Sequence, residues 1–227
     1  MYDFVINSFD FVYYIDCIGV TIPLLVFLFF WKKISFVGKN LVVGFYFIFW
    51  VGTLAASIPD SIYELKDNTW IYDLIPFFIS FPLFFFYKKV IKSRFASRVN
   101  IISGIILLIF YLITFKNIFN GKLNVEFYLL LALFILINSV FYLYQELNQL
   151  QEIIVYKRTE FWFIASLFFY AGVCSLVWSF FYYVGTLPYE ENTWRTGIMW
   201  PICHNTALFI QSLVFSLGML WNVKKQL

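Results

Sequence analysis

Residues 125–144 read VEFYLLLALFILINSVFYLY, a run of 20 residues whose only charge is Glu126. A helix that crosses the hydrocarbon core of a bilayer needs about 20 mostly apolar residues, so this run predicts a transmembrane helix. Outward from it, further apolar runs alternate with polar loops. Counted together they predict seven membrane-spanning helices, at about residues 11–31, 41–58, 71–87, 99–118, 125–144, 161–184 and 198–222.

The composition agrees with this prediction. The 227 residues are 62% hydrophobic and 13% charged, with a mean hydropathy of +0.81. Soluble domains are about half apolar and about a quarter charged, so a water-soluble fold could not cover this much apolar surface. We expect an all-α integral membrane protein, with residues 1–227 forming a single seven-helix bundle in contact with the lipid bilayer.

The basic residues predict how the bundle lies in the membrane. Cytoplasmic loops are enriched in Lys and Arg. If the N-terminus lies outside, 12 of the 16 basic residues fall on the cytoplasmic side and 4 on the outer side. We therefore expect an outer N-terminus and a cytoplasmic C-terminus in a bacterial inner membrane.

No motif of a known enzyme class is found. The single histidine, His204, cannot build a polyhistidine metal site, and the sequence holds no G-x-S-x-G motif, phosphate-binding glycine loop or H-E-x-x-H helix. The three cysteines lie in apolar runs without metal-ligand spacing. We expect no enzyme activity, no catalytic residue, no metal and no cofactor.

Ionisable side chains within predicted spans are costly, so each needs a structural or functional reason. Asp16, Asp73 and His204 are all predicted in the outer third of the membrane. They could line an outward-opening ligand site, or they could form an interhelical hydrogen-bond network that only stabilises packing. The remaining candidate ligand-binding residues are Trp70, Trp194, Trp200 and Gln211.

The last predicted helix has two different faces. At about 100° per residue, its polar residues share one arc and its aliphatic residues share the other. We expect the polar arc to face the bundle interior, where its groups can find partners. The arc holds Pro201, His204, Asn205, Gln211, Ser212 and Ser216, and the aliphatic side holds Ile202, Ile210, Leu213, Leu217 and Leu220. In the helix before it, Ala171, Ser175 and Ser179 form a small-residue stripe that predicts close helix contact.

Two further features leave alternatives open. Asn-Thr-Trp occurs at residues 68–70 and 192–194, which could mark a repeat of three helices, a linking helix and three helices, as in some transporters, or could be chance. The polar segments 88–98 and 145–160 could bind a protein partner, although the second could be a solvated connector. Because basic residues beside a membrane commonly set orientation and touch anionic lipid, we expect no nucleic-acid binding at 88–98.

Several short motifs point to a family. These are residues 68–73 (NTWIYD) leading to residues 87–89 (YKK), residues 161–163 (FWF), and residues 200–205 (WPICHN) with a Gly-containing aliphatic run to Trp221. Together they resemble small seven-helix membrane proteins of Bacteroidota, related to membrane regions that precede sensor kinases. The resemblance implies a sensory or accessory role and names no ligand.

From these features we expect a sensory or regulatory membrane protein. It would bind a small ligand or an envelope partner from the outer side, and it would signal through a protein partner at 88–98 and 145–160. A small-solute transporter and a structural subunit of a membrane complex are the alternatives.

Overall fold

The computed structural model describes residues 2–62, 69–115, 124–148, 155–184 and 200–224, and every regular element among them is helical. The α-helices are α1 (Tyr2–Phe30), α2 (Lys39–Ile62), α3 (Thr69–Val90), α4 (Arg94–Thr114), α5 (Val125–Asn148), α6 (Thr159–Val184) and α8 (Thr206–Lys224). A short 3₁₀ turn, η2 (Val155–Lys157), precedes α6, and a π-helical turn, η3 (Trp200–Asn205), leads into α8.

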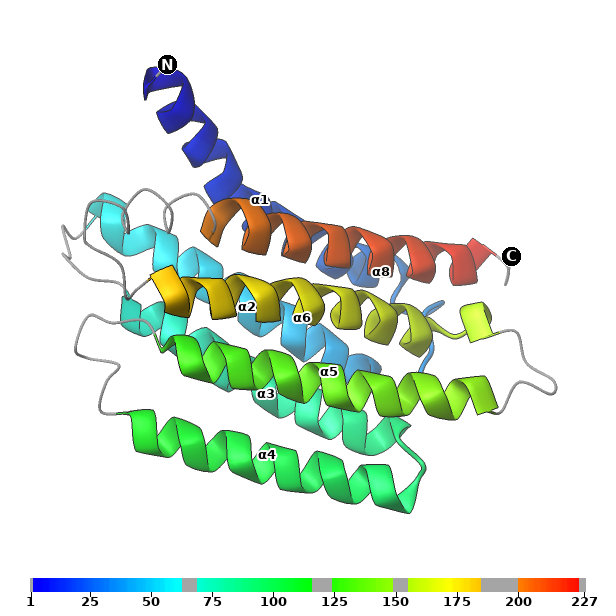
Figure 1. The fold of residues 1–227 in the computed structure, drawn as a ribbon. Helices are drawn as coiled ribbons and strands as arrows, with labels where there is room; N and C mark the ends of the chain where they lie inside the picture. The colour runs from blue at the N-terminus through cyan, green and yellow to red at the C-terminus, as the bar shows by residue number, and fades with distance from the viewer. Residues whose placement is uncertain (1, 63–68, 116–123, 149–154, 185–199, 225–227) are drawn as a thin grey trace.

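Five of these helices, α3, α4, α5, α6 and α8, are long and apolar enough to cross a membrane. The described parts of α1 and α2 contribute shorter apolar stretches, Cys17–Phe30 and Lys39–Ala55. A chain with this many apolar helices is a multi-pass membrane protein. Consecutive helices run in alternate directions, so the turns 31–38 and 91–93 and the end of α8 all lie at one end of the bundle (Figure 1). We call this the basic end.

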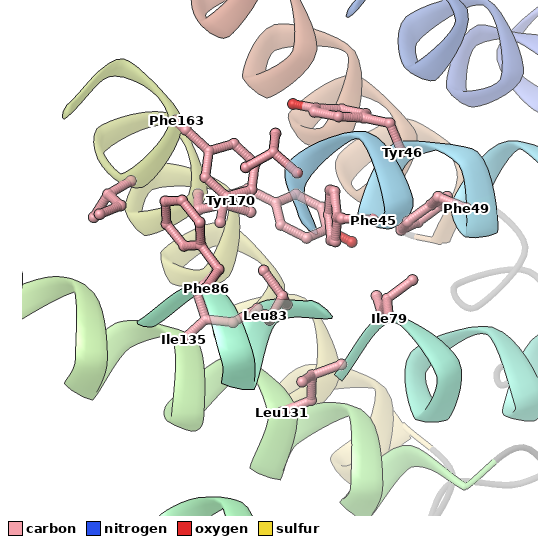
Figure 2. Close-up of a cluster of buried hydrophobic side chains, with 14 of the residues drawn as sticks. Phe45, Tyr46, Phe49, Ile79, Leu83, Phe86, Leu131, Ile135, Phe163 and Tyr170 are labelled. Carbon is pink, nitrogen blue, oxygen red and sulfur yellow. The ribbon is translucent and has the colours of Figure 1, made fainter. Parts of the chain in front are cut away.

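The helices form a ring that follows the chain. α1 packs on α2, α2 on α3, α3 on α5, α5 on α6, α6 on α8, and α8 returns to α1. α4 lies outside this ring against α3 and α5, and it is the least buried of the five long helices (Figure 1). Aromatic and aliphatic side chains of α2, α3, α5 and α6 meet inside the ring, as Figure 2 shows.

Most helices extend beyond the apolar runs that predicted them. The helix predicted from residue 99 begins at Arg94, because Ser93 caps it by accepting a hydrogen bond from the Ala96 amide at 3.5 Å. The helix predicted to end at residue 144 continues to Asn148. Polar first and last turns belong to these helices, although they lie outside the apolar runs.

The two-faced character of the last helix is confirmed. Gln211 and Ser212 have no exposed surface and Ser216 is 3% exposed, whereas Leu217 on the other face is 64% exposed. Of the small-residue stripe of α6, Ala171 is buried as predicted and Ser175 is half-buried, but the prediction is wrong for Ser179, which is exposed. Its hydroxyl donates to the Ser175 carbonyl at 2.7 Å, and this bond within the helix removes the need for a partner on another helix.

Candidate functional site

A cavity of about 50 Å³ lies inside the ring, between α2, α3, α5, α6 and η3. One water needs roughly 10–15 Å³ in this kind of measure, so the space holds about three to five waters or a solute of that size. The walls are mainly apolar, and Figure 2 shows Phe45, Phe49, Ile79 and Leu131 among the converging side chains. The lining side chains with polar atoms are Thr53, Tyr72, Tyr128, Tyr170, Cys174, Trp178, His204 and Asn205.

The cavity lies in the half of the bundle away from the basic end. Thr53 is late in α2, Tyr72 is in the first turn of α3, Tyr128 is in the first turn of α5, and Trp178 is late in α6. Since consecutive helices alternate in direction (Figure 1), these positions all fall in the half of the bundle away from the basic end. His204 reaches the same half from η3, just before α8 begins.

His204 forms the polar end of the cavity, and 5% of its surface is exposed. Its Nδ1 lies 3.1 Å from the side-chain oxygen of Asn205, and its Nε2 lies 2.9 Å from the Tyr170 hydroxyl. An amide oxygen can only accept, so Nδ1 of the neutral ring carries the proton and donates it to Asn205. Nε2 therefore accepts from the Tyr170 hydroxyl. This pairing holds the imidazole in one tautomer and one orientation.

An aromatic pair forms the wall beside His204. The ring of Trp178 lies 5.9 Å from the His204 ring, edge to face, and it stacks on Tyr128 with 4.2 Å between the ring centroids. The Tyr128 hydroxyl donates to the Tyr72 carbonyl at 2.5 Å. The pair thus links η3 through α6 and α5 to α3.

Asp73 is buried at 1% exposure in a second polar cluster, beside the cavity. Its Oδ1 accepts from the Asn124 backbone amide at 3.0 Å, and the Asn124 side chain donates to the Thr114 hydroxyl at 2.7 Å. The Asn124 side-chain oxygen in turn accepts from the Phe127 amide at 3.2 Å, at the start of α5. Asp73 therefore fixes the first turn of α5 to α3. The residue before it, Tyr72, is the one that lines the cavity.

Gln211 belongs to a third polar cluster, nearer the middle of the bundle. Its amide nitrogen donates to the Tyr46 hydroxyl at 2.6 Å and to the Ser166 hydroxyl at 3.3 Å, which links α8 to α2 and α6. The Tyr46 ring stacks on Phe215, with 5.7 Å between the centroids. Gln211 does not line the cavity.

The other predicted site residues fall outside the cavity lining or outside the described side chains. Trp70, in the first turn of α3, is 38% exposed and is not among the lining residues. Asp16 is within α1 and Trp200 begins η3, but their side chains lie outside the described part of the structure, and Trp194 lies outside the described residues altogether. The site prediction for these three residues stays a prediction.

Sequence reasoning left out Tyr170, Trp178, Tyr128 and Thr53, which line the cavity with His204. The available signal was that Tyr and Trp carry a polar atom on an apolar body, and such atoms find a hydrogen-bond partner when buried. In a chain with 31 Phe, 16 Tyr and 8 Trp, that signal does not single out particular rings.

The described side chains include no group of three or more His, Cys, Asp or Glu residues that could hold a metal ion. The described cavity lining contains no residue with a formal charge once His204 is neutral. The site is thus suited to bind an uncharged molecule through hydrogen bonds and apolar contact. No family model, curated protein or solved structure matches the chain.

Proposed function

We propose that the chain crosses a bacterial inner membrane seven times, with the N-terminus outside and the C-terminus in the cytoplasm. The alternating helix directions support this orientation, because they gather the basic loops at one end (Figure 1). The last turns of α3 and α8 carry Lys88, Lys89 and Lys224 at that end. Positive charge marks the cytoplasmic side of a membrane protein.

We propose that this protein is a sensory or regulatory membrane protein that binds a small uncharged solute in the His204 cavity, entering from the outer side. The observation that carries the proposal is the cluster of His204, Tyr170 and Asn205 on the wall of an internal space in the half of the bundle away from the basic end. A purely structural cluster would need no space beside it.

The cavity sets limits on the ligand. A solute of about four non-hydrogen atoms could gain at most about 1.5 kcal/mol per atom, or about 6 kcal/mol, which corresponds to a Kd of about 40 µM. It would place a hydrogen-bonding group against the Tyr170 hydroxyl or the Asn205 side-chain amide, because both ring nitrogens of His204 are already hydrogen-bonded, and a small apolar part against Phe49 and Leu131. A larger solute would require the rings of Tyr128 and Trp178 to move.

The signal would pass along the helices to the basic end. His204 is in the π turn η3, and π turns are often found at functional sites because the backbone there is irregular. A solute bound against Tyr170 and Asn205 would displace His204, which they hold, and so change this turn, and α8 continues from the turn to the cytoplasmic side. The proposed partner surface is segments 88–98 and 145–160, where Phe95, Leu147 and Tyr156 are exposed.

A matched pair of variants tests the proposal. His204→Ala and Gln211→Ala each remove a buried side chain that is hydrogen-bonded to a tyrosine hydroxyl, but only His204 lines the cavity. Each should cost about 1–3 kcal/mol of stability. The probe is a panel of ethanol, acetamide and urea at millimolar concentration, and thermal unfolding is measured in nanodiscs. A saturating ligand raises stability by about 2.7 kcal/mol at 100 times its Kd.

We expect at least one of these solutes to stabilise the wild type and Gln211→Ala but not His204→Ala. If none of the solutes stabilises the wild type, or if both variants respond like the wild type, the cluster of His204, Tyr170 and Asn205 is a packing network. The proposal that the protein senses a solute in this cavity, which we call the receptor proposal, is then wrong.

A small-solute transporter is the second candidate, and one observation favours it. The order α1–α2–α3 on one side of the ring matches the order α5–α6–α8 on the other, with α4 outside. Such an arrangement is expected of a three-plus-one-plus-three repeat, although any ring that follows the chain also has it. Uptake of a stabilising solute into proteoliposomes would favour transport, and binding without uptake would favour sensing.

A further inference from the structure

A second hollow, which we call the lysine cleft, lies at the basic end between the α3–α4 turn, the end of α5, η2 and the start of α6. Its volume is about 390 Å³, within the range of roughly 300–1,000 Å³ typical of ligand pockets. The His204 cavity is much smaller, at about 50 Å³. Its lining includes Lys89, Lys92, Lys157 and Arg158, together with the carboxylates Glu146 and Glu160.

Both carboxylates of the cleft already have partners. Glu146 is 4% exposed and accepts from Arg158 at 2.6 Å, which is the one ion pair within the described residues. Glu160 accepts from the Val37 backbone amide at 3.2 Å. The ammonium groups of the three lysines have no ion pair among the described residues. The cleft thus has an excess of positive charge that its own acids do not neutralise.

The walls of the cleft are fixed by hydrogen bonds. The Lys92 backbone amide donates to the Gln145 side-chain oxygen at 2.6 Å, and the Gln145 amide nitrogen donates to the Val90 carbonyl at 3.2 Å. These bonds fasten the α3–α4 turn to α5. On the other side, Asn222 donates to the Thr159 hydroxyl at 3.2 Å, which links α8 to the start of α6. A ligand would meet a preformed site, which lowers the entropic cost of binding.

We propose that the lysine cleft binds a phosphate group. Three lysines come from three segments, namely the last turn of α3, the α3–α4 turn and η2, and surround one polar hollow. A phosphate offers several strong acceptor oxygens and carries the charge that these ammonium groups need. The phosphate could belong to an anionic phospholipid headgroup, because the basic end is expected at the membrane surface, or to a soluble phosphate compound.

The site would join the two segments 88–98 and 145–160, since Lys89 and Lys92 belong to one and Lys157 to the other. The inference does not depend on the His204 cavity or on the receptor proposal. It rests only on the cleft, its charges and its fixed walls.

Two triple variants with the same change of charge test it. The cleft variant is Lys89→Gln, Lys92→Gln and Lys157→Gln. The control changes three exposed lysines of the same end that do not line the cleft, Lys32→Gln, Lys33→Gln and Lys88→Gln. Wild type and both variants are placed in phosphatidylcholine nanodiscs and titrated with pyrophosphate. Separately, native mass spectrometry measures how much phosphatidylglycerol each protein retains from mixed nanodiscs.

We expect the cleft variant to lose about tenfold or more in affinity for at least one of these anions, and the control to lose less than about threefold. Retention of phosphatidylglycerol without pyrophosphate binding identifies a lipid headgroup site, and pyrophosphate binding that phosphatidylglycerol competes for identifies a site open to soluble phosphates. Because all six lysines are exposed, both variants should unfold at the wild-type temperature. The single change Lys157→Glu provides a second test if the triple does not fold. The proposal is overturned if wild type binds neither anion, or if both triples weaken binding equally.

Discussion

Gly218 of α8 lies directly against Trp162 of α6, and this contact predicts a large effect for a single methyl group. A Cβ added at Gly218 would lie 2.2 Å from Trp162 Cγ, 2.6 Å from its Cβ and 2.7 Å from its Cδ1. Favourable carbon contacts need about 3.5–4.0 Å. Trp162 cannot easily turn away, because its indole nitrogen donates to the Tyr156 carbonyl at 2.8 Å.

The expected magnitude for Gly218→Ala follows from two opposing effects. Overpacking costs about 1–3 kcal/mol, and the overlap with the base of a side chain places this site near the upper limit. Replacing glycine by alanine inside a helix gains up to about 1 kcal/mol. The net result is a loss of about 2 kcal/mol. In the control Gly172→Ala, nothing lies within 4 Å of the added Cβ, so only the stabilisation from the better helix propensity of alanine remains.

The assay is the unfolding of each variant in mixed micelles by titration with dodecyl sulfate, followed by circular dichroism. Gly218→Ala should unfold at a lower denaturant fraction than wild type, and Gly172→Ala at the same or a higher fraction. Equal stability of the two variants would show that α6 and α8 do not meet at Gly218, and the ring order would lose one of its closest contacts.

Other predictions concern topology and the basic end. A reporter enzyme that works only outside the cytoplasm should be active when it is fused after Asp3, Asp67 or Glu191. It should be silent when it is fused after Arg94 or Leu227. Activity of the fusion at Leu227 would require an even number of membrane spans. Arg158→Met should destabilise the protein by up to about 3–5 kcal/mol, because it leaves the carboxylate of Glu146 buried without its partner. Adding Glu146→Gln to Arg158→Met should recover much of this loss of stability in the same unfolding assay. If stability does not recover, the buried ion pair between Arg158 and Glu146 is not the cause of the loss.

The helices could be predicted from the sequence because each contains a long apolar run, and membrane helices must satisfy their backbone groups internally. The inward face of α8 could be predicted for a related reason, since a buried amide such as that of Gln211 needs a partner. Its actual partner, Tyr46 of α2, could not be predicted. That contact depends on which helices are neighbours in the ring, and no local pattern encodes the ring order.

The predicted ligand-binding role of Asp73 and His204 stays a prediction. Their shared depth does not say which side chains share a cavity. In the structure, Asp73 binds the backbone amide of Asn124 at the start of α5, whereas His204 lines the cavity. The small-residue stripe of α6 was predicted correctly at Ala171 but not at Ser179, because serine hydroxyls can bond within their own helix. Glycines such as Gly52, whose added Cβ would lie 2.4 Å from Ile75, mark the close approaches instead.

The most direct test of the His204 cavity is chemical modification of Cys174, whose side chain lines it and is buried. A thiol reacts as its thiolate, which needs water or a polar solute beside it, so reaction reports that small molecules enter. In a variant with Cys17→Ser and Cys203→Ser, nanodisc protein is treated with methyl methanethiosulfonate and followed by intact mass. We predict modification of the folded protein, slowed strongly by Ala132→Leu, which fills the cavity. Cys174 that reacts only on unfolding, or at the same rate with Ala132→Leu, would contradict a ligand site at His204.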